Sequence, residues 1–369
     1  MLPDFSKANG MMQQMARAAF CAAVGVTQVF AAEVDQFTLP PGEPVQLPDS
    51  ALVLQTEVNR LLRHAIQRAN ERFMETRPKS APRWVQPSCD ETRLYNALSG
   101  ELARSVVGQL ESFAETSPDI TRRRVLLEQS IYRDFYWQAS PTLVLSERMA
   151  GVIKVNGVEM GTDKLGHFFT EGYSYFLVTE ELNKSVESGL LFGEWSESVY
   201  FGAQTTGVFS FADLTANFQG LRFWNRVLAL QPDPLNGQTP TPYIVCSDSR
   251  WTLARTFEWR DYVDNGWNEA INCPALGSDE LLQRIRQHGA QCRTDKLPDS
   301  KYGQWQPRLL NAYGHRVLPG YLQPEIVLEL RAARNDVDVS LETLGYIGEL
   351  RVRLEAWRRA ASAAAAQVK

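Results

Sequence analysis

Residues 161–178 read GTDKLGHFFTEGYSYFLV, and this stretch decides the fold. Asp163, His167 and Glu171 follow one another at intervals of four residues, which places all three on one face of an α-helix. The other faces are apolar, with leucine, valine and aromatic side chains. Because a helix that is apolar nearly all round is a buried helix, the stretch predicts a helical core that hides an acid, an imidazole and a second acid.

Outward from this stretch, apolar residues recur at helical spacing along most of the chain. A different pattern occupies residues 152–160, where Asn156-Gly157 supplies the positive φ angles of a two-residue hairpin turn. The predicted fold class is therefore mostly α: a helical bundle-like globular protein with one small β-hairpin near 152–160. The expected helices span residues 51–76, 90–114, 121–137, 163–181, 186–201, 210–230, 279–288 and 341–365.

The chain divides into segments of different character. Residues 1–31 are typical of a secretory signal peptide, with a short apolar run and small residues near Ala31, where we expect cleavage. Residues 32–50 are proline-rich and predict an extended arm. Residues 51–230 predict a helical core domain that carries the polar site, and residues 231–369 predict an aromatic-rich region of mixed and helical structure.

Composition narrows the class of protein. The chain has 369 residues, of which 44% are hydrophobic and 22% are charged, as in ordinary globular proteins. It contains no run of the roughly 18 apolar residues that a membrane-spanning helix needs. The net charge is −5 and no long run of lysine and arginine is present, which argues against a nucleic-acid partner. Composition leaves the oligomeric state open.

The cysteines indicate the compartment. Cys21 would leave with the signal peptide, and the four that remain are Cys89, Cys246, Cys273 and Cys292. An even number of cysteines in an exported chain predicts two disulfides. Among the possible pairings we favour Cys246 with Cys273, or Cys273 with Cys292. The expected location is the periplasm or the outside of the cell, after cleavage of the signal.

A second polar segment lies at residues 207–220. Asp213 and Asn217 are four residues apart, and Gly220, on the same face, allows another helix to approach closely. Ser210 precedes Asp213 by three residues, which resembles a capping box at the start of a helix.

Glu197 lies in the expected helix between the two polar segments. Buried polar groups need partners. We therefore expect the helices that begin at Asp163 and Ser210 to pack side by side, with His167 within reach of Asp213, Asn217 or Glu197.

The order of these motifs resembles that of VanZ-like and YfiM-like envelope proteins. In those families a D-K-x-x-H-F helix start is followed by a glutamate helix and then by a D-L-x-A-N-x-x-G helix. The match runs from Asp163 to Gly220. The resemblance implies a link to the cell envelope and a shared polar site. VanZ-like members are membrane proteins, whereas these helices carry too many polar residues to span a bilayer.

Two acids in one buried site suit glycoside hydrolysis, in which one carboxyl group is protonated and the other is ionised. We expect Glu171, buried against aromatic rings, to be the general acid, and Asp213, at a helix start, to be the ionised base or nucleophile. His167 would orient one of them, and Glu197 is a further catalytic candidate. The sequence predicts an exported hydrolase that acts on an envelope or extracellular glycan without a cofactor.

Two other interpretations of the same residues stay open. Asp163, His167 and Glu171 would form the ligand set of a metal-dependent hydrolase, and Mn, Ca or Mg would suit such oxygen-rich ligands better than zinc. Alternatively, the polar residues only stabilise the core, and the chain is a non-catalytic binding or assembly factor of the cell envelope.

Substrate contacts are expected from Asn217, beside the acids, and from aromatic side chains in the C-terminal half. Trp259, Tyr262 and Trp267 lie close together among charged residues. Because aromatic rings stack on the apolar faces of sugars, this segment predicts a polysaccharide or a peptidoglycan-type glycan as the partner.

Overall fold

The structure is a computed structural model. Within the residues that it describes, the chain is mostly helical with a few short antiparallel strand pairs, which confirms the predicted fold class. The expected signal peptide and the expected helix 341–365 lie outside those residues. The described residues are 33–39, 46–76, 89–103, 108–133, 149–180, 183–197, 208–276, 283–284, 292–298 and 300–311.

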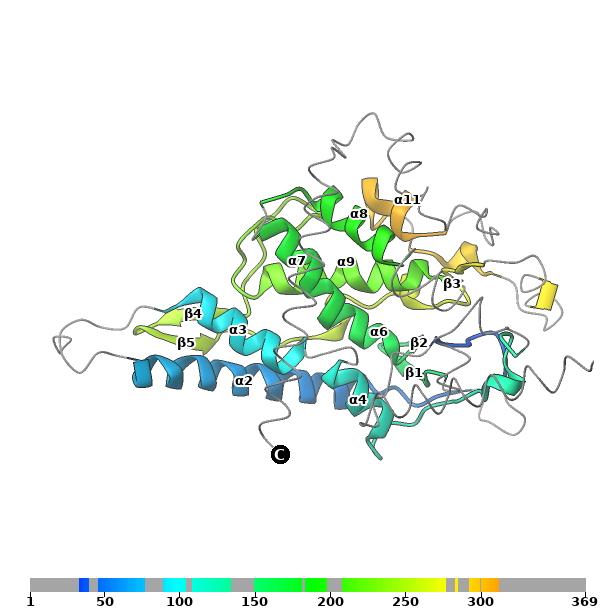
Figure 1. The fold of residues 1–369 in the computed structure, drawn as a ribbon, viewed down its shortest axis with the longest axis horizontal. Coiled ribbons are helices and arrows are strands. Elements are labelled where there is room, and N and C mark those ends of the chain that lie inside the picture. Colours follow the sequence, from blue (N-terminus) through cyan, green and yellow to red (C-terminus); the bar gives the residue numbers. More distant parts are fainter. Residues whose placement is uncertain are drawn as a thin grey trace, which may run out of the picture.

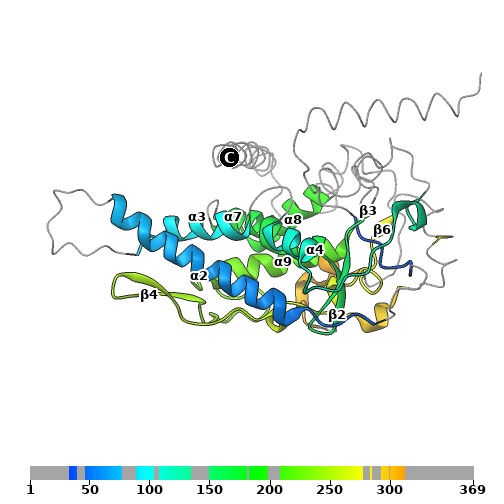
Figure 2. The ribbon, with the colours of Figure 1, turned by 90° about the horizontal axis from the view of Figure 1, so that it is seen from below.

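One long helix, α2 (Ala51–Thr76), runs along one side of the molecule, and its bounds match the prediction (Figure 1). The helix begins where Asp49 Oδ1 accepts the Ala51 N–H at 2.8 Å. Its apolar stripe is buried against α3 (Glu91–Leu102) and α4 (Gln109–Thr116), to which α2 lies obliquely (Figure 2). The single helix expected at 90–114 is therefore two helices.

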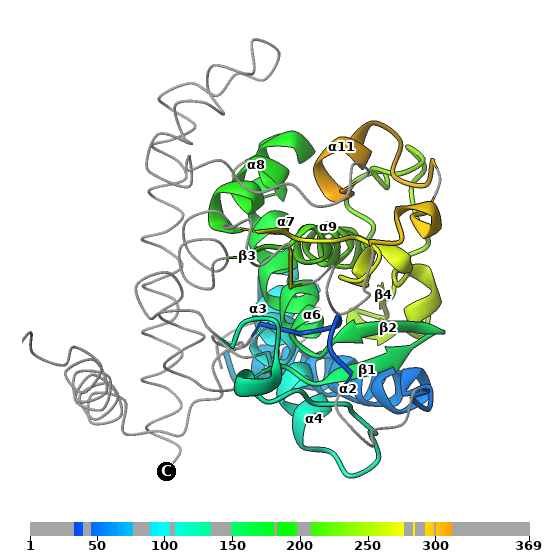
Figure 3. The ribbon, with the colours of Figure 1, turned by 90° about the vertical axis from the view of Figure 1, so that its right-hand side faces the viewer.

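The quoted stretch forms one helical run through the centre. It comprises α6 (Asp163–Gly166), a π-helical segment η2 (His167–Glu171) and α7 (Gly172–Glu180). This run packs along α9 (Phe211–Arg226), which lies in the middle of the molecule when viewed along its long axis (Figure 3). Helix α8 (Val186–Ser196) covers α7 on the side away from α2. The predicted side-by-side packing is confirmed.

Two glycines let the central helices touch at their backbones. A Cβ atom at Gly172 would meet Gly220 Cα, and one at Gly220 would overlap the Phe168 carbonyl oxygen. The absence of a side chain at Gly220 thus permits the close approach that the sequence predicted.

We expect Gly220→Ala to destabilise the protein by about 3 kcal/mol, because the added methyl group forces the two backbones apart. Gly100→Ala is the matched control, since a Cβ there meets nothing within 4 Å. That change in α3 should stabilise the fold by about 0.5–1 kcal/mol. Urea unfolding of both variants measures the difference, and equal midpoints would contradict the close helix crossing.

The predicted hairpin is present as β1 (Val152–Val155) and β2 (Val158–Gly161). Asn156 and Gly157 form its turn with φ angles of 51° and 81°. Asp49 holds this turn by accepting the Asn156 and Gly157 N–H groups at 3.1 and 2.7 Å.

Further strand pairs were not expected from the sequence. Strand β3 (Val208–Phe209) pairs with β6 (Ala275–Leu276), and β4 (Ile244–Ser247) forms a second hairpin with β5 (Arg250–Leu253). The remaining short elements are η4 (Trp259–Asp261), η5 (Asn265–Trp267), η6 (Thr294–Lys296), η7 (Gly303–Trp305) and α11 (Gln306–Leu309).

The prediction of a helix at 121–137 is wrong for residues 121–133. The chain there is extended, bridges Val152 of the hairpin through Arg123, and contains one 3-10 turn, η1 (Leu127–Gln129). Pairing of the Arg123 backbone with the hairpin edge satisfies the groups that a helix would have paired internally. Residues 134–137, and nearly all of the short helix expected at 279–288, lie outside the described part of the chain.

Both predicted disulfides are present. Cys273 pairs with Cys292, one of the favoured pairs, but Cys246 pairs with Cys89 and not with Cys273. The Cys89–Cys246 bond joins the start of α3 to β4, two segments that only the fold brings together. Disulfides of this kind are typical of chains in oxidising compartments. Within the described ranges, we find no helix whose length and apolar character would let it cross a bilayer.

Candidate functional site

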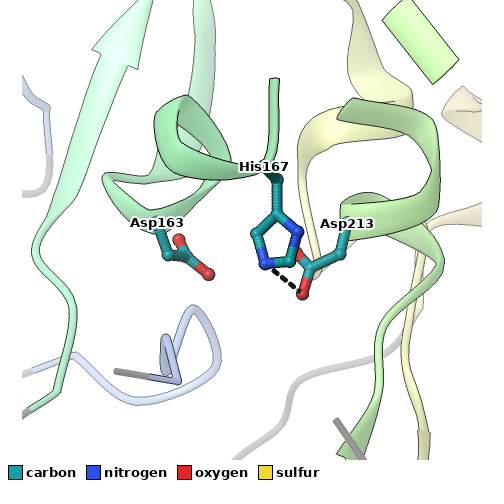
Figure 4. A group of neighbouring side chains, drawn as sticks. All are labelled: Asp163, His167 and Asp213. Atoms are coloured by element: carbon teal, nitrogen blue, oxygen red, sulfur yellow. Dashed lines mark ion pairs between the residues drawn. The ribbon is translucent and has the colours of Figure 1, made fainter. Parts of the chain in front are cut away.

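Three sequence-predicted residues converge at the contact between α6, η2 and α9. Ligating atoms of Asp163, His167 and Asp213 all lie within 4.8 Å of one another. His167 stands between the two acids, and its Nε2 lies 3.1 Å from Asp213 Oδ2 (Figure 4). His167 Nδ1 lies 3.1 Å from the side-chain amide of Asn217. The expected reach of His167 to Asp213 and Asn217 is confirmed.

A residue to which the sequence motif assigns no role lies at the centre of the cluster. Lys164 is fully buried, and its Nζ contacts Asp163 Oδ2 at 2.8 Å, Asp213 Oδ1 at 2.5 Å and Glu269 Oε1 at 2.7 Å. The sequence does contain a signal for this role, because a lysine within an apolar helix is buried only when it is paired. Glu269 comes from a loop with no helical pattern, so no signal in the sequence indicated it.

Ser210 links three of the acids. Its Oγ donates to Glu269 Oε1 at 2.9 Å and accepts the Asp213 N–H at 3.2 Å, while its own N–H donates to Glu197 Oε1 at 3.0 Å. The capping role predicted for Ser210 is confirmed. The cap also ties Glu197, at the end of α8, to the start of α9.

Two acids that interact electrostatically with His167, Asp213 and Glu197, have pKa values shifted in opposite directions. Burial alone would raise the pKa of Asp213, but the charges of His167 and Lys164 outweigh it and hold that pKa well below its usual range. Burial, strengthened by the Asp213 charge, raises the pKa of Glu197 to about 8. At neutral pH, Asp213 is therefore ionised and Glu197 is protonated.

His167 carries its proton at neutral pH. Burial lowers the pKa of this imidazole, but the ion pair with Asp213 outweighs that effect and raises the pKa to about 10. His167 Nδ1 lies 3.1 Å from the side-chain amide of Asn217, and the other end of that amide lies 3.3 Å from Tyr175 Oη. This chain of hydrogen bonds fixes the plane of the imidazole ring.

Carboxyl groups outnumber cations in and around the cluster. Burial raises the pKa of Glu269 to about 7, although Lys164 partly offsets the effect. The pKa values of Glu33 and Glu111 are raised far more, in both cases mainly by burial. Lys164 and His167 cannot balance the charge of so many carboxylates, so several of these acids are protonated.

Glu171 does not belong to the group formed by Asp163, His167 and Asp213. It lies buried at the end of η2, where its charge adds to the effect of burial in raising the pKa of Tyr175. A π-helix has more residues per turn than an α-helix. Glu171, four residues after His167 at the end of this segment, is therefore not aligned with Asp163 and His167. The third member of the group is Asp213 of α9.

The aromatic residues predicted to bind substrate lie in the core. Trp259, Tyr262 and Trp267 are at most 1% exposed. Their rings pack around Phe168, with centroid distances of 5.5, 5.2 and 5.5 Å. This burial leaves no ring face open to a sugar, which corrects the substrate-binding role expected for these three residues.

An internal ammonium engages the same carboxylates that a metal ion would use. Lys164 already engages Asp163 and Asp213, and a histidine ligand must be neutral, whereas His167 is protonated. Binding of Mn, Ca or Mg would therefore require both the movement of Lys164 and the loss of the His167 proton.

Glu197→Gln is expected to flatten the fall in stability between pH 5.5 and 8.5. Because the folded-state pKa of Glu197, about 8, exceeds its ordinary value of 4.5, its contribution to stability is full below 4.5 and is lost as the pH rises through 8. The wild type should lose about 3 kcal/mol more than the variant over this window.

Urea unfolding at the two pH values measures this difference. The glutamine can still accept the Ser210 N–H, so the variant retains that hydrogen bond. The other groups that titrate are common to both proteins. Identical pH dependence in the two proteins would contradict the raised pKa of Glu197.

No family model, no curated protein and no solved structure matches the chain. The resemblance to VanZ-like and YfiM-like proteins therefore stays a prediction from the motifs.

Proposed function

We propose that this chain is an exported hydrolase that cleaves a glycan of the cell envelope or of the extracellular space. Asp213 is the base or nucleophile, and Glu197 is the general acid. The observation that carries the proposal is that Ser210 links the two acids, since its N–H donates to Glu197 Oε1 at 3.0 Å and its Oγ accepts the Asp213 N–H at 3.2 Å. The opposed pKa shifts support it, with a pKa of about 8 for Glu197 and one well below the usual range for Asp213. Paired carboxyl groups whose environments separate their pKa values are the usual arrangement for acid–base hydrolysis.

Each group has a definite part in the proposed reaction. Glu197 gives its proton to the oxygen of the scissile glycosidic bond as that bond breaks. Asp213 either takes a proton from an attacking water molecule or attacks the anomeric carbon itself, and the stereochemistry of the product distinguishes the two routes. His167, 13% exposed, is a more open side chain than Asp213, which is 8% exposed.

The proposed location follows from the disulfides and from the signal-like residues 1–31. Two disulfides favour an oxidising compartment, which for this chain would be the periplasm or the outside of the cell after cleavage near Ala31. A peptidoglycan-type glycan or another polysaccharide is the substrate class that such a location offers.

Digestion of purified glycans tests the proposal. The purified chain is incubated with peptidoglycan and with a panel of soluble polysaccharides, and the products are identified by mass spectrometry. We expect new reducing ends with the wild type and none with Asp213→Asn. Folded wild-type protein that releases no product from any of these glycans would overturn the proposal.

A second candidate function is a non-catalytic binding or assembly factor of the envelope. The complete burial of Lys164 among three carboxylates favours it, because such a network also occurs as a structural element. Under this alternative, the protein would sediment with insoluble peptidoglycan without cleaving it, and Asp213→Asn would only lower the melting temperature.

A further inference from the structure

Lys164 connects three parts of the chain that are distant in sequence. Its ammonium contacts Asp163 on the same helix, Asp213 on α9, and Glu269 in the loop after η5. A fully buried ammonium is tolerated only where acceptors and opposite charges surround it. Lys164 Nζ donates to Asp163 Oδ2 and Glu269 Oε1 and forms an ion pair with Asp213 Oδ1.

The two oxygens of Asp213 have different partners. Oδ1 lies 2.5 Å from Lys164 Nζ, and Oδ2 lies 3.1 Å from His167 Nε2. Because the carboxylate is planar, the contact on Oδ1 fixes its rotation and so fixes the direction in which Oδ2 points. Without the lysine, the ion pair with His167 is the remaining contact of this carboxylate among the described residues.

The lysine is itself anchored from outside the cluster. Glu269 Oε1 accepts both Lys164 Nζ and Ser210 Oγ, at 2.7 and 2.9 Å. The Glu269 N–H donates to Gln36 Oε1 at 2.9 Å, and Gln36 Nε2 donates to the Glu159 carbonyl of β2 at 3.1 Å. The position of the ammonium is thus tied to the arm and to the hairpin.

We infer that Lys164 is a positioning residue for the proposed hydrolysis: its ammonium, anchored by Glu269, holds Asp213 with Oδ2 turned toward His167. The inference rests on the proposed function for its catalytic meaning. The contact between Lys164 and Asp213 is independent of that function and can be tested without a substrate.

The protonation of His167 reports the position of Asp213. The charged and polar groups around His167 come from four elements: Asp163 and Lys164 from α6, Glu111 from α4, Glu197 from the end of α8, and Asp213 and Asn217 from α9. Around Asp213 itself lie His167, Lys164, Asp163, Glu197, Glu269 and Glu33.

Removal of the Lys164 charge and release of Asp213 have opposite effects on His167. The Lys164 charge lowers the pKa of His167, so its removal with Asp213 still in place would raise that pKa. If Asp213 is released and turns away, His167 loses the partner that raises its pKa, and the pKa falls. The sign of the change therefore separates positioning from charge alone.

The experiment is a pH titration of the imidazole signals by NMR in Lys164→Met. The chain has four histidines, and His167→Gln assigns the signal of interest. We expect the His167 pKa to fall by about 2 units from its wild-type value of about 10. Lys296→Met, a change at an exposed lysine, is the control and should leave the titration unchanged. A His167 pKa that rises or stays constant in Lys164→Met would overturn the inference.

A second variant covers the case in which Lys164→Met fails to fold. Lys164→Met/Glu269→Gln removes one cation and one acid together, which avoids an uncompensated buried charge. The same fall of the His167 pKa is expected in it, and an unchanged pKa would overturn the inference. Because the titration needs no substrate, a protein that cleaves no glycan but shows the fall refutes the proposed function and leaves the positioning role standing.

Discussion

Replacement of Asp213 by asparagine is expected to lower the rate of glycan hydrolysis about a thousandfold or more. The amide has the same volume as the carboxylate but carries no charge, so it can neither accept a proton from water nor attack the anomeric carbon. Product release followed by mass spectrometry measures the loss. Undiminished product formation by the variant would refute the role of Asp213.

The matched control for this prediction is Glu171→Gln. From the sequence alone, Glu171 and Asp213 form the catalytic pair, and both amide variants would abolish activity. In the structure, Glu171 lies outside the group formed by Asp163, His167 and Asp213, and Glu197 has the raised pKa of a general acid. We therefore expect Glu197→Gln to share the large loss and Glu171→Gln to retain more activity. A larger loss of activity in Glu171→Gln than in Glu197→Gln would instead support Glu171 and Asp213 as the catalytic pair.

Stability must be measured beside activity in Asp213→Asn. The substitution leaves Lys164 and His167 without the acid that they share, and removal of one partner from a buried ion pair costs about 3–5 kcal/mol. Rates are therefore compared at a temperature where circular dichroism shows both proteins to be folded.

Removal of the Cys89–Cys246 disulfide is expected to destabilise the fold by about 5 kcal/mol. This bond closes a loop of 157 residues, whereas the Cys273–Cys292 bond closes one of 19. Because a disulfide restricts the unfolded chain more when its loop is longer, the second bond should contribute only about 3 kcal/mol.

The two alanine pairs, Cys89→Ala/Cys246→Ala and Cys273→Ala/Cys292→Ala, serve as controls for each other. Chemical unfolding of each against the wild type gives the two free energies. Equal losses would show that restriction of the unfolded chain does not determine the contribution of these bonds.

Local patterns predicted the elements whose signals lie within a few residues. The hairpin follows from Asn156-Gly157, because few other residue pairs adopt two positive φ angles in succession. Helix α2 follows from its apolar period and from the cap by Asp49, and α9 follows from Ser210. The helix expected at 121–133 failed because the hairpin edge offers that segment backbone partners, which the segment's own residues do not reveal.

The residues of the site likewise divide into those predicted from local patterns and those placed by tertiary contacts. The spacing of polar residues in an apolar helix is a local property, so it predicted that Asp163, His167, Asp213 and Asn217 lie on buried helical faces. Because buried polar groups need partners, it also predicted that these residues contact one another.

Tertiary packing determines which other groups complete the cluster. Lys164 meets Glu269 across 105 residues of sequence, and the π-helical turn of η2 separates Glu171 from the other acids. It also decided that Cys246 pairs with Cys89 and that the ring of Trp259 fills the core. Each of these outcomes depends on the packing of segments distant in sequence, and the free energy of such contacts is absent from any local pattern.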